Sequence, residues 1–293
     1  IQGHLVIHIE NLSFEYRKTK LYQQFNLKLS EPGVYGVFGR NGSGKSTLLK
    51  LLAGLLFPQK GNIDVRGFSP AKRHPEFLAQ IYIVPEEFHL PNLTARQLAK
   101  SQSVFYPKFS HETFTEYLAI FEISDKQSFD EMSLGQKKKA ALSFALATFT
   151  PILLLDEPTN GLDIIGRDQF KLIMSRPEQR KRLVLISTHQ AHDLERIMSH
   201  ILFIDSATLA LSATMAELSS ALVMGVAQDA NELSGFADVI YSESMGLQYA
   251  YVARNNSGVQ SPVHLELLYK ALSLQKDGIL GALKISREET THV

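Results

Sequence analysis

A glycine-rich segment near the start of the chain has the residue types and spacing of a loop that binds phosphate. The pattern G-x-x-x-x-G-K-[ST] is matched by Gly39, Gly44, Lys45 and Ser46. The glycines allow successive backbone N–H groups to point at phosphate oxygens, and the N-terminus of a following helix adds partial positive charge. We therefore expect Lys45 to reach the β- and γ-phosphates of a nucleotide and Ser46 to ligate Mg²⁺. The alternative is a glycine-rich turn that merely precedes a helix.

A pair of carboxylates is the second candidate for chemistry. Four apolar residues, 152–155, are followed by Asp156 and Glu157 at the carboxyl end of a predicted strand, where open α/β sheets bind ligands. Because neighbouring residues of a strand point to opposite faces, the two carboxylates are expected to have different tasks. We predict that Asp156 belongs to the Mg²⁺ shell and that Glu157 polarises a water in line with the γ-phosphate. Read alone, the pair is equally typical of a surface turn.

Strands and helices alternate around these two segments. Apolar residues at every second position predict strands at 5–16 and 25–30, and a stripe of leucines predicts a helix from Lys45 to near Pro58. Residues 88–150 have mostly helical spacing. Short buried strands are predicted at 33–38, 81–85, 152–158, 182–189 and 200–205. The alternation predicts an α/β fold with a parallel sheet covered by helices on both faces.

The character of the chain changes near Glu217. Residues 236–254 have the pattern of a β-hairpin with Gly246 in its turn, and residues 264–275 have that of a short amphipathic helix. We therefore expect one domain at 1–216 and a small α+β accessory domain at 217–293, whose role no motif indicates.

Composition narrows the classes of function. The 293 residues carry 30 Lys and Arg against 30 Asp and Glu, so the net charge gives no general attraction to nucleic acid or anionic lipid. The absence of cysteine excludes disulfides, thiol catalysis and Cys-ligated metals. The longest stretch without a charged residue, 140–155, contains Pro151 and is too short to span a membrane, and the first ten residues lack the features of a signal peptide. We expect a soluble chain whose membrane role, if any, comes through a partner.

Taken in order, the motifs resemble those of the ATP-binding-cassette (ABC) ATPases. The resemblance covers about residues 3–215 and rests on GRNGSGKST, MSLGQ at 132–136, LLLDEPTNGLD and STHQ. It implies a P-loop NTPase fold with an N-terminal antiparallel β subdomain and a helical subdomain at about 88–150. By resemblance, the MSLGQ segment opens a helix whose N-terminus faces the γ-phosphate bound to the opposite subunit, and a Ser–Gly turn there would expose N–H donors to an anion. Read alone, the same segment is a helix N-cap.

The resemblance also implies roles for single residues. Tyr16 takes the place of the aromatic ring that stacks on adenine, with Phe14 as a competing candidate and core packing as the alternative. His189 takes the place of a histidine that contacts the γ-phosphate and orients the attacking water, which makes Glu157 and His189 the catalytic pair. A metal pair of His189 and His192 is an interpretation that no other residue supports. Asp163 takes the place of a residue that communicates across the dimer.

Two sets of binding residues follow from the resemblance. In the signature segment, Met132 and Leu134 depart from the family's LSGGQ while Ser133 and Gly135 are kept. The signature residues expected to act on the ATP of the opposite subunit are Ser133, Leu134, Gly135 and Gln136. The residues expected to bind ATP within the chain are Tyr16, Gly39, Arg40, Asn41, Gly42, Ser43, Gly44, Lys45, Ser46 and Thr47.

Two further departures from the family pattern and one run of charged residues complete the comparison. The family usually has Gln where this chain has Glu86, which keeps an oxygen for Mg²⁺, adds negative charge near the phosphates and resembles exporters of the ABC-2 type. The Mg²⁺ ligands are thus expected to be Ser46, Asp156 and Glu86. Ala207 stands where many relatives have Gly in a reverse turn. We interpret the run of lysines at 137–139 as a solvated helix face, with nucleic-acid contact as the alternative.

The function implied is that of the ATP-binding, ATP-hydrolysing subunit of an ABC transporter, an exporter of ABC-2 type. Such a chain works as a head-to-tail homodimer or heterodimer, with two Mg·ATP between the P-loop of one subunit and the signature segment of the other. Its partner would be a separate transmembrane permease, facing residues 86–93, that holds the chain on the cytoplasmic, inner face of the cell membrane. The permease, not this chain, would bind the transported substrate.

Two other functions remain as alternatives. A soluble cassette protein that acts on ribosomes or nucleic acid typically has two cassettes or coiled-coil insertions, whereas this chain has one cassette, no heptad run and zero net charge. A degenerate cassette that only binds ATP as a regulator is disfavoured because Lys45, Asp156, Glu157 and His189 are all present; Glu86 and Leu134 leave that alternative open. No nucleic-acid partner is expected.

Overall fold

The computed structural model describes residues 6–17, 19–189 and 194–291. The chain divides into two compact units. The first comprises Ile1–His189 and Ile204–Leu209, and the second comprises Gln190–Phe203 and Ala210–Val293. The domain boundary at residue 216 expected from the sequence stays a prediction.

Parallel strands form the core of the first unit, as the alternation of elements predicts. The six-stranded sheet has the order β5-β6-β7-β3-β8-β9, and the pairs β5–β6, β6–β7 and β3–β7 are parallel. The strands are β3 (Gly33–Phe38), β5 (Ile81–Val84), β6 (Ile152–Asp156), β7 (Leu183–Ser187), β8 (His200–Asp205) and β9 (Thr208–Thr214), of which β8 and β9 have residues in both units. Every residue of β3, β6 and β7 is buried. Continuous apolar runs are what a parallel sheet covered on both faces requires.

The carboxyl ends of these strands place three segments at one edge of the sheet. The glycine-rich loop follows β3, Glu157 follows β6, and His189 comes two residues after β7. Because parallel strands end at the same edge, residues more than 100 positions apart in sequence are brought together there.

The helix after the glycine-rich loop, α1 (Lys45–Leu52), is shorter than the leucine stripe predicts. It buries Leu48, Leu49, Leu51 and Leu52, but it ends before Gly54, which has a φ of 67°. A glycine in the left-handed region typically terminates a helix. Here a side chain is also excluded, because a Cβ at Gly54 would lie 2.3 Å from the carbonyl oxygen of Pro70. Leu55, expected within the helix, is therefore in a turn and 48% exposed.

An antiparallel sheet of order β2-β1-β4 forms the expected N-terminal subdomain. Its strands are β1 (Ile7–Tyr16), β2 (Thr19–Leu29) and β4 (Lys60–Val65). The hydrophobic pattern did not predict β4, whose first three residues are exposed.

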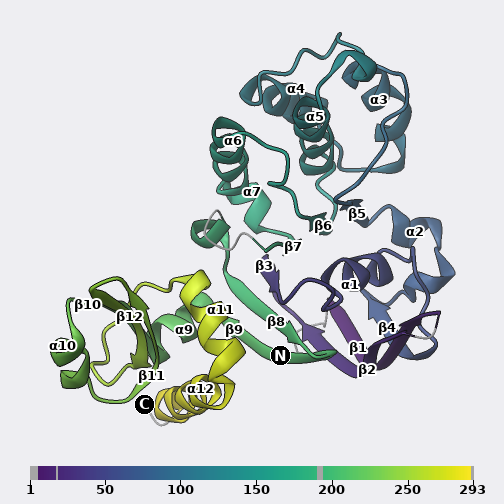
Figure 1. Ribbon diagram of the computed structural model, residues 1–293. Coiled ribbons are helices and arrows are strands. Elements are labelled where there is room, and N and C mark those ends of the chain that lie inside the picture. The colour runs from purple at the N-terminus through teal and green to yellow at the C-terminus, as the bar shows by residue number, and fades with distance from the viewer. Residues whose placement is uncertain (1–5, 18, 190–193, 292–293) are drawn as a thin grey trace. The chain divides into compact units, whose positions relative to one another are not determined.

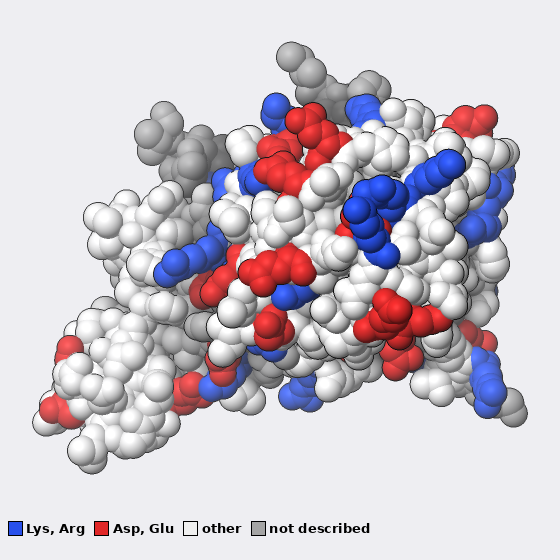
Figure 2. All heavy atoms as spheres, turned by 90° about the horizontal axis from the view of Figure 1, so that it is seen from above, with Lys and Arg blue, Asp and Glu red and all other residues white. Residues whose placement is uncertain are grey.

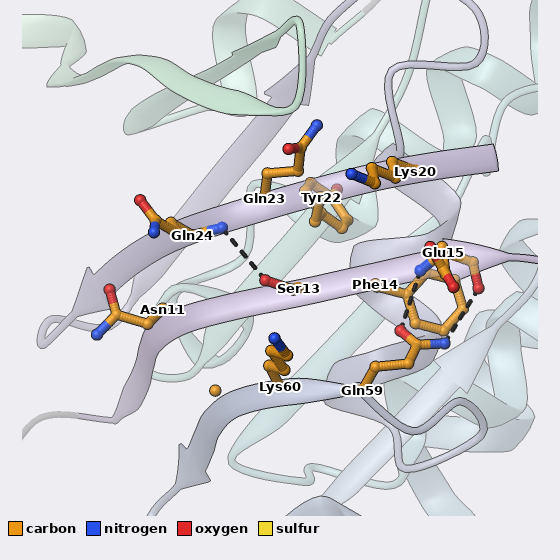
Figure 3. Close-up of a pocket in the computed structure, with 11 residues that line it drawn as sticks. Asn11, Ser13, Phe14, Glu15, Lys20, Tyr22, Gln23, Gln24, Gln59 and Lys60 are labelled. Atoms are coloured by element: carbon orange, nitrogen blue, oxygen red, sulfur yellow. Dashed lines mark hydrogen bonds between the residues drawn. The ribbon is translucent and has the colours of Figure 1, made fainter. Parts of the chain in front are cut away.

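A pocket of about 680 Å³ opens in this antiparallel sheet (Figure 3). At one wall, the side chain of Gln59 exchanges two hydrogen bonds with the backbone of Glu15, at 3.0 and 3.1 Å. Another lining residue, Tyr22, extends its hydroxyl group to Gly44 of the glycine-rich loop. The subdomain thereby supports the loop directly.

The segment 88–150 is mostly helical, as predicted, and Figure 1 shows its helices gathered together, away from the antiparallel sheet. Phe144 packs against Phe109, Phe114, Tyr82 and Tyr106, with ring centroids 4.9 to 6.2 Å apart, which joins the helices to β5. The helices are α3 (Ala95–Gln102), α4 (His111–Ile120) and α5 (Leu134–Ala147). Elsewhere in the unit lie α2 (Pro75–Leu78), α6 (Ile164–Met174) and α7 (Pro177–Arg180).

The second unit is α+β, in agreement with the sequence. Its antiparallel sheet has the order β10-β12-β11, and Gly246, with a φ of 73°, lies in the turn of the predicted hairpin. The strands are β10 (Leu222–Ala227), β11 (Val239–Met245) and β12 (Gln248–Arg254), and the helices are α9 (Met215–Ala221), α10 (Ala230–Gly235), α11 (Leu265–Leu274) and α12 (Lys276–Thr291). Of these helices, the sequence predicted only α11. Within the described residues of both units, no helix has the length and apolar composition needed to cross a membrane.

The turn between β8 and β9 holds an alanine in a conformation that favours glycine. Ser206 and Ala207 have φ values of 47° and 68°, as a two-residue type I′ turn requires. We predict that Ala207→Gly raises the free energy of unfolding by about 0.5–1 kcal/mol, because glycine avoids the steric penalty of a positive φ. Urea denaturation measures the change. Ala210→Gly, within β9, is the matched control and should lower the stability; an unchanged or lower midpoint for Ala207→Gly would contradict the prediction.

Candidate nucleotide-binding site

The loop between β3 and α1 has the conformation that its glycines permit. Gly42 and Gly44 have φ values of 78° and 107°, and the backbone N–H of Ser43 donates to the carbonyl of Arg40 at 3.0 Å. The ammonium group of Lys45 lies inside the loop, where it donates to the carbonyls of Gly39 at 2.9 Å and Arg40 at 3.1 Å. Burial lowers the pKa of Lys45, and the negative charges of three carboxylates act in the opposite direction. The loop thus positions a cation next to its backbone N–H groups.

Tyr22 fixes the last glycine of the loop. Its hydroxyl donates to the carbonyl of Gly44 at 2.8 Å, and a Cβ at Gly44 would lie 2.5 Å from the same hydroxyl oxygen. Tyr22 is 1% exposed, and this burial raises its pKa. The loop conformation therefore depends on a residue of the antiparallel sheet that the sequence did not single out.

We predict that Tyr22→Phe lowers the free energy of unfolding by about 1 kcal/mol and weakens ATP binding several-fold, because the carbonyl of Gly44 loses the hydroxyl donor and keeps the N–H of Leu48. Chemical denaturation and titration with a fluorescent ATP analogue measure the two effects. Tyr35→Phe is the matched control, since the Tyr35 hydroxyl donates to the carbonyl of Glu31 at 3.0 Å, outside the loop. Equal ATP affinities for the two variants would contradict the proposed link between Tyr22 and the loop.

Ser46 and Asp156 form an oxygen pair suited to Mg²⁺. The Ser46 hydroxyl donates to Oδ1 of Asp156 at 2.9 Å, and the hydroxyl of Ser187 donates to the same oxygen. Among the described residues, no three His, Asp or Glu side chains converge into a group that could hold a metal ion. Mg²⁺ needs no such group, because it is usually bound by one or two protein oxygens together with waters and substrate phosphates. The donor set therefore fits the Mg²⁺ that accompanies ATP.

Glu157 and His189 meet at the same edge of the sheet. Nδ1 of His189 lies 2.8 Å from Oε1 of Glu157, and the backbone N–H of His189 donates to Oε2 at 3.4 Å. The side chain of Glu157 is 8% exposed and that of His189 is 46% exposed, so the imidazole lies on the open side. The expectation that Glu157 is a strand residue is wrong: β6 ends at Asp156, and Glu157 has a φ of 46°. The two carboxylates differ in their partners because the chain turns between them. His192 lies outside the described residues.

Tyr16 lies beside the glycine-rich loop with its ring half exposed. Its hydroxyl is 3.2 Å from the hydroxyl of Thr47, and its ring meets that of Phe14 edge to face at 4.9 Å. Tyr16 is 46% exposed and Phe14 only 5%. Of the two aromatic candidates, Tyr16 is therefore the one available to a base.

The signature segment starts α5 as a capping box. The Ser133 hydroxyl accepts from the backbone N–H of Gln136 at 3.2 Å, and the Gln136 side chain accepts from the N–H of Ser133 at 2.9 Å. A Cβ at Gly135 would lie 2.9 Å from the carbonyl of Gly161, so the segment packs against the loop before α6. Leu134 is 69% exposed. The signature residues and the 160–163 loop thus lie side by side on one surface.

Asp163 begins α6 at this surface. Its Oδ1 accepts from the backbone N–H of Gly166 at 2.9 Å and lies 3.4 Å from the ammonium of Lys139. The bond from Gly166, together with Lys139, lowers the pKa of Asp163.

The prediction that residues 137–139 form a solvated helix face is wrong for two of the three lysines. Lys138 is buried, at 3% exposure, and Lys139 pairs with Asp163 with its side chain 13% exposed. Lys137 is partly exposed. The sequence could not reveal this, because the groups that cover Lys138 come from a loop 52 residues earlier.

Glu86 lies on an exposed loop after β5, and its Oε1 accepts from Nδ2 of Asn160 at 2.9 Å. Its charge acts on Lys45: burial lowers the pKa of that lysine, and Glu157, Asp156 and Glu86 oppose this shift. Asn160 contacts Glu86, and Ser187 contacts Asp156. A sequence signal could have indicated both of these contact residues. Ser187 is the polar end of an apolar strand, paired in register with Asp156, and Asn160 belongs to the motif that contains Asp163.

Comparison with known proteins agrees with this arrangement. The family model described as "ABC transporter" matches residues 22–160. The ABC transporter ATP-binding protein YtrB of Bacillus subtilis strain 168 is 30% identical over 206 residues, which cover 70% of each chain. This chain belongs to the ABC transporter ATP-binding proteins. The bacitracin transport ATP-binding protein BcrA of Bacillus licheniformis is 32% identical to this ABC protein over 200 residues, 67% of this chain and 65% of BcrA.

Solved structures confirm the fold of this ABC protein. A dimeric structure of a post-hydrolysis state of the ATP-binding cassette MJ0796, bound to ADP and Pi, superposes with a TM-score of 0.61 at 21% identity. The match covers 71% of this chain and 98% of that one. The fold expected from the motifs is thereby confirmed.

Proposed function

We propose that this ABC ATPase drives transport through a separate membrane-spanning partner, with Lys45, Asp156, Glu157 and His189 as the residues that bind and hydrolyse ATP. The observation that carries the proposal is the convergence of these four residues at the carboxyl edge of one parallel sheet. Lys45 would bind the β- and γ-phosphates, and Glu157 would accept a proton from the attacking water. His189, hydrogen-bonded to Glu157, would orient that water.

Mg²⁺ would be held by Ser46 and Asp156, with Glu86 as the third expected ligand. When bound, the ion would neutralise charge on the β- and γ-phosphates as it develops in the transition state. The hydroxyls of Ser46 and Ser187, which both donate to Oδ1 of Asp156, would orient the carboxylate for this role. Glu86 would have to leave Asn160 to reach the ion.

The chain would act as a dimer, because the exposed signature residues would bind the ATP held by the P-loop of a second chain. Gly135, beside Gly161, would offer its backbone N–H group in the first turn of α5, where an anion is stabilised, while Ser133 caps the helix. Exposed Leu134, Ile164 and Ile165 surround the same place and would be covered by the second subunit. Each of two ATP molecules would then bridge a P-loop and the signature segment of the other chain.

Export, the ABC-2 subtype and a cytoplasmic position on the inner membrane face belong to the same proposal. They are supported by Glu86, by the resemblance to BcrA, whose name records bacitracin transport, and by the family itself. Figure 2 shows Lys and Arg interspersed with Asp and Glu over the face that it presents, rather than a broad basic surface of the kind that binds nucleic acid.

Affinity purification of the tagged chain from detergent-solubilised native cells, followed by mass spectrometry, tests this function. We expect a multi-spanning membrane protein in stoichiometric amount. Ribosomal proteins or nucleic acid without a membrane protein would instead favour a soluble cassette that acts on those partners.

A further inference from the structure

One buried lysine joins two segments of the site that are far apart in sequence. Lys138 lies in the second turn of α5, with 3% of its surface exposed. Its ammonium donates to the backbone carbonyl of Glu86 at 3.3 Å and lies 5.6 Å from the centre of the Phe88 ring. Both contacts come from the loop that follows β5. The charged end of Lys138 therefore fastens this loop to the helix that begins at the signature segment.

Lys138 also belongs to the charge network of the nucleotide site. Burial lowers its pKa, and the carboxylates of Glu86, Asp156 and Glu157 act against that effect. The same three carboxylates act on Lys45. A buried ammonium group is stable only where opposite charge and hydrogen-bond acceptors compensate for lost water. Three carboxylates and two lysines thus form one set, into which ATP brings further negative charge.

We infer that Lys138 is a positioning residue for ATP hydrolysis: it offsets the negative charge of Glu86 and holds the Glu86 loop against the signature helix. The inference rests on the proposed function. Glutamate at position 86 adds a negative charge near the proposed phosphate site. Lys138, which donates to the backbone carbonyl of Glu86, brings a cation to this loop from 52 residues further along the chain. Because Lys138 lies in the helix that Ser133 caps, a movement of the signature helix would carry the Glu86 loop with it.

A double-mutant cycle on the purified full-length chain tests the inference. Steady-state ATP hydrolysis is measured for Lys138→Gln, Glu86→Gln and the combined variant. We expect each single change to lower kcat about tenfold with KM for ATP little changed, because the charges around the γ-phosphate are no longer balanced. The combined variant, which is neutral at both positions, should recover to within about threefold of the wild type, whereas independent effects would multiply to about a hundredfold loss.

Lys137→Gln is the matched control, since Lys137 neighbours Lys138 on the same helix and is partly exposed. Its kcat should stay within about twofold of the wild type. Equal activities of Lys137→Gln and Lys138→Gln, or multiplicative losses in the combined variant, would overturn the inference. If thermal unfolding shows that Lys138→Gln does not fold, Lys138→Met keeps the apolar stem, and the cycle is repeated with it.

The two proposals fail in different ways. If the wild-type chain shows no hydrolysis that depends on Glu157, the proposed function is wrong. If the wild type hydrolyses ATP through Glu157 but the changes at Glu86 and Lys138 act independently, only the role assigned to Lys138 is wrong.

Discussion

Replacing Glu157 with Gln is expected to lower kcat for ATP hydrolysis by about 10³-fold while ATP still binds, because glutamine cannot accept the proton of the attacking water. The geometry around Glu157 supports a large effect. Its side chain is 8% exposed, one oxygen lies 2.8 Å from the ring of His189, and its backbone N–H donates to the carbonyl of Ser187 at 3.0 Å. Its position is thus fixed by the fold, and a glutamine of the same shape would keep it.

The same variant should accumulate as a dimer with ATP. If hydrolysis resets the closed dimer, blocking it leaves two ATP molecules between the subunits, and sedimentation velocity with Mg·ATP should show a shift from monomer to dimer. Glu112→Gln, at an exposed position in α4, is the control and should hydrolyse ATP at the wild-type rate. A Glu157→Gln chain that stays monomeric with unchanged turnover would contradict the mechanism.

Replacing Lys45 with Met should weaken ATP binding by about a hundredfold, which corresponds to about 3 kcal/mol and to the loss of charge-assisted hydrogen bonds to two phosphates. Lys45 is 7% exposed, and its ammonium is held by the carbonyls of Gly39 and Arg40. Because this position is set by the loop itself, little reorganisation is needed when phosphate binds.

Titration with a fluorescent ATP analogue measures the loss at Lys45. Lys50→Met, in the last turn of the same helix, is the matched control and should leave the dissociation constant unchanged within about twofold. A Lys45→Met chain that folds and binds ATP as tightly as Lys50→Met would show that the phosphates do not lie against this loop.

Much of the fold follows from local pattern. The run at 152–155 is apolar at every position and the run at 33–38 has no charged residue, as in strands buried on both faces, so the parallel core was predictable. The strand β4 was not, because three of its six residues are exposed and Gly61 interrupts it with a φ of 88°. The end of α1 was missed because Leu55 and Leu56 continue the leucine stripe past Gly54.

The candidate site was predictable where reactive residue types stand in a motif of fixed spacing, as at Lys45, Asp156 and Glu157. It was not predictable where burial is decided by distant segments. Three consecutive lysines normally face solvent, and Lys138 is buried only because the Glu86 loop and Phe88 cover it. Tyr22 was missed for the same reason, since its contact with Gly44 joins two elements across 22 residues.

The central claim is that this chain hydrolyses ATP as part of a membrane assembly. The most direct test is ATP turnover by the assembly that copurifies with the tagged chain, compared with the assembly purified through Glu157→Gln. We predict the same membrane partner in both preparations, Mg²⁺-dependent hydrolysis with the wild type, and a rate lower by about 10³-fold with Glu157→Gln. Equal rates in the two preparations, or bound ATP without turnover in either, would contradict the account.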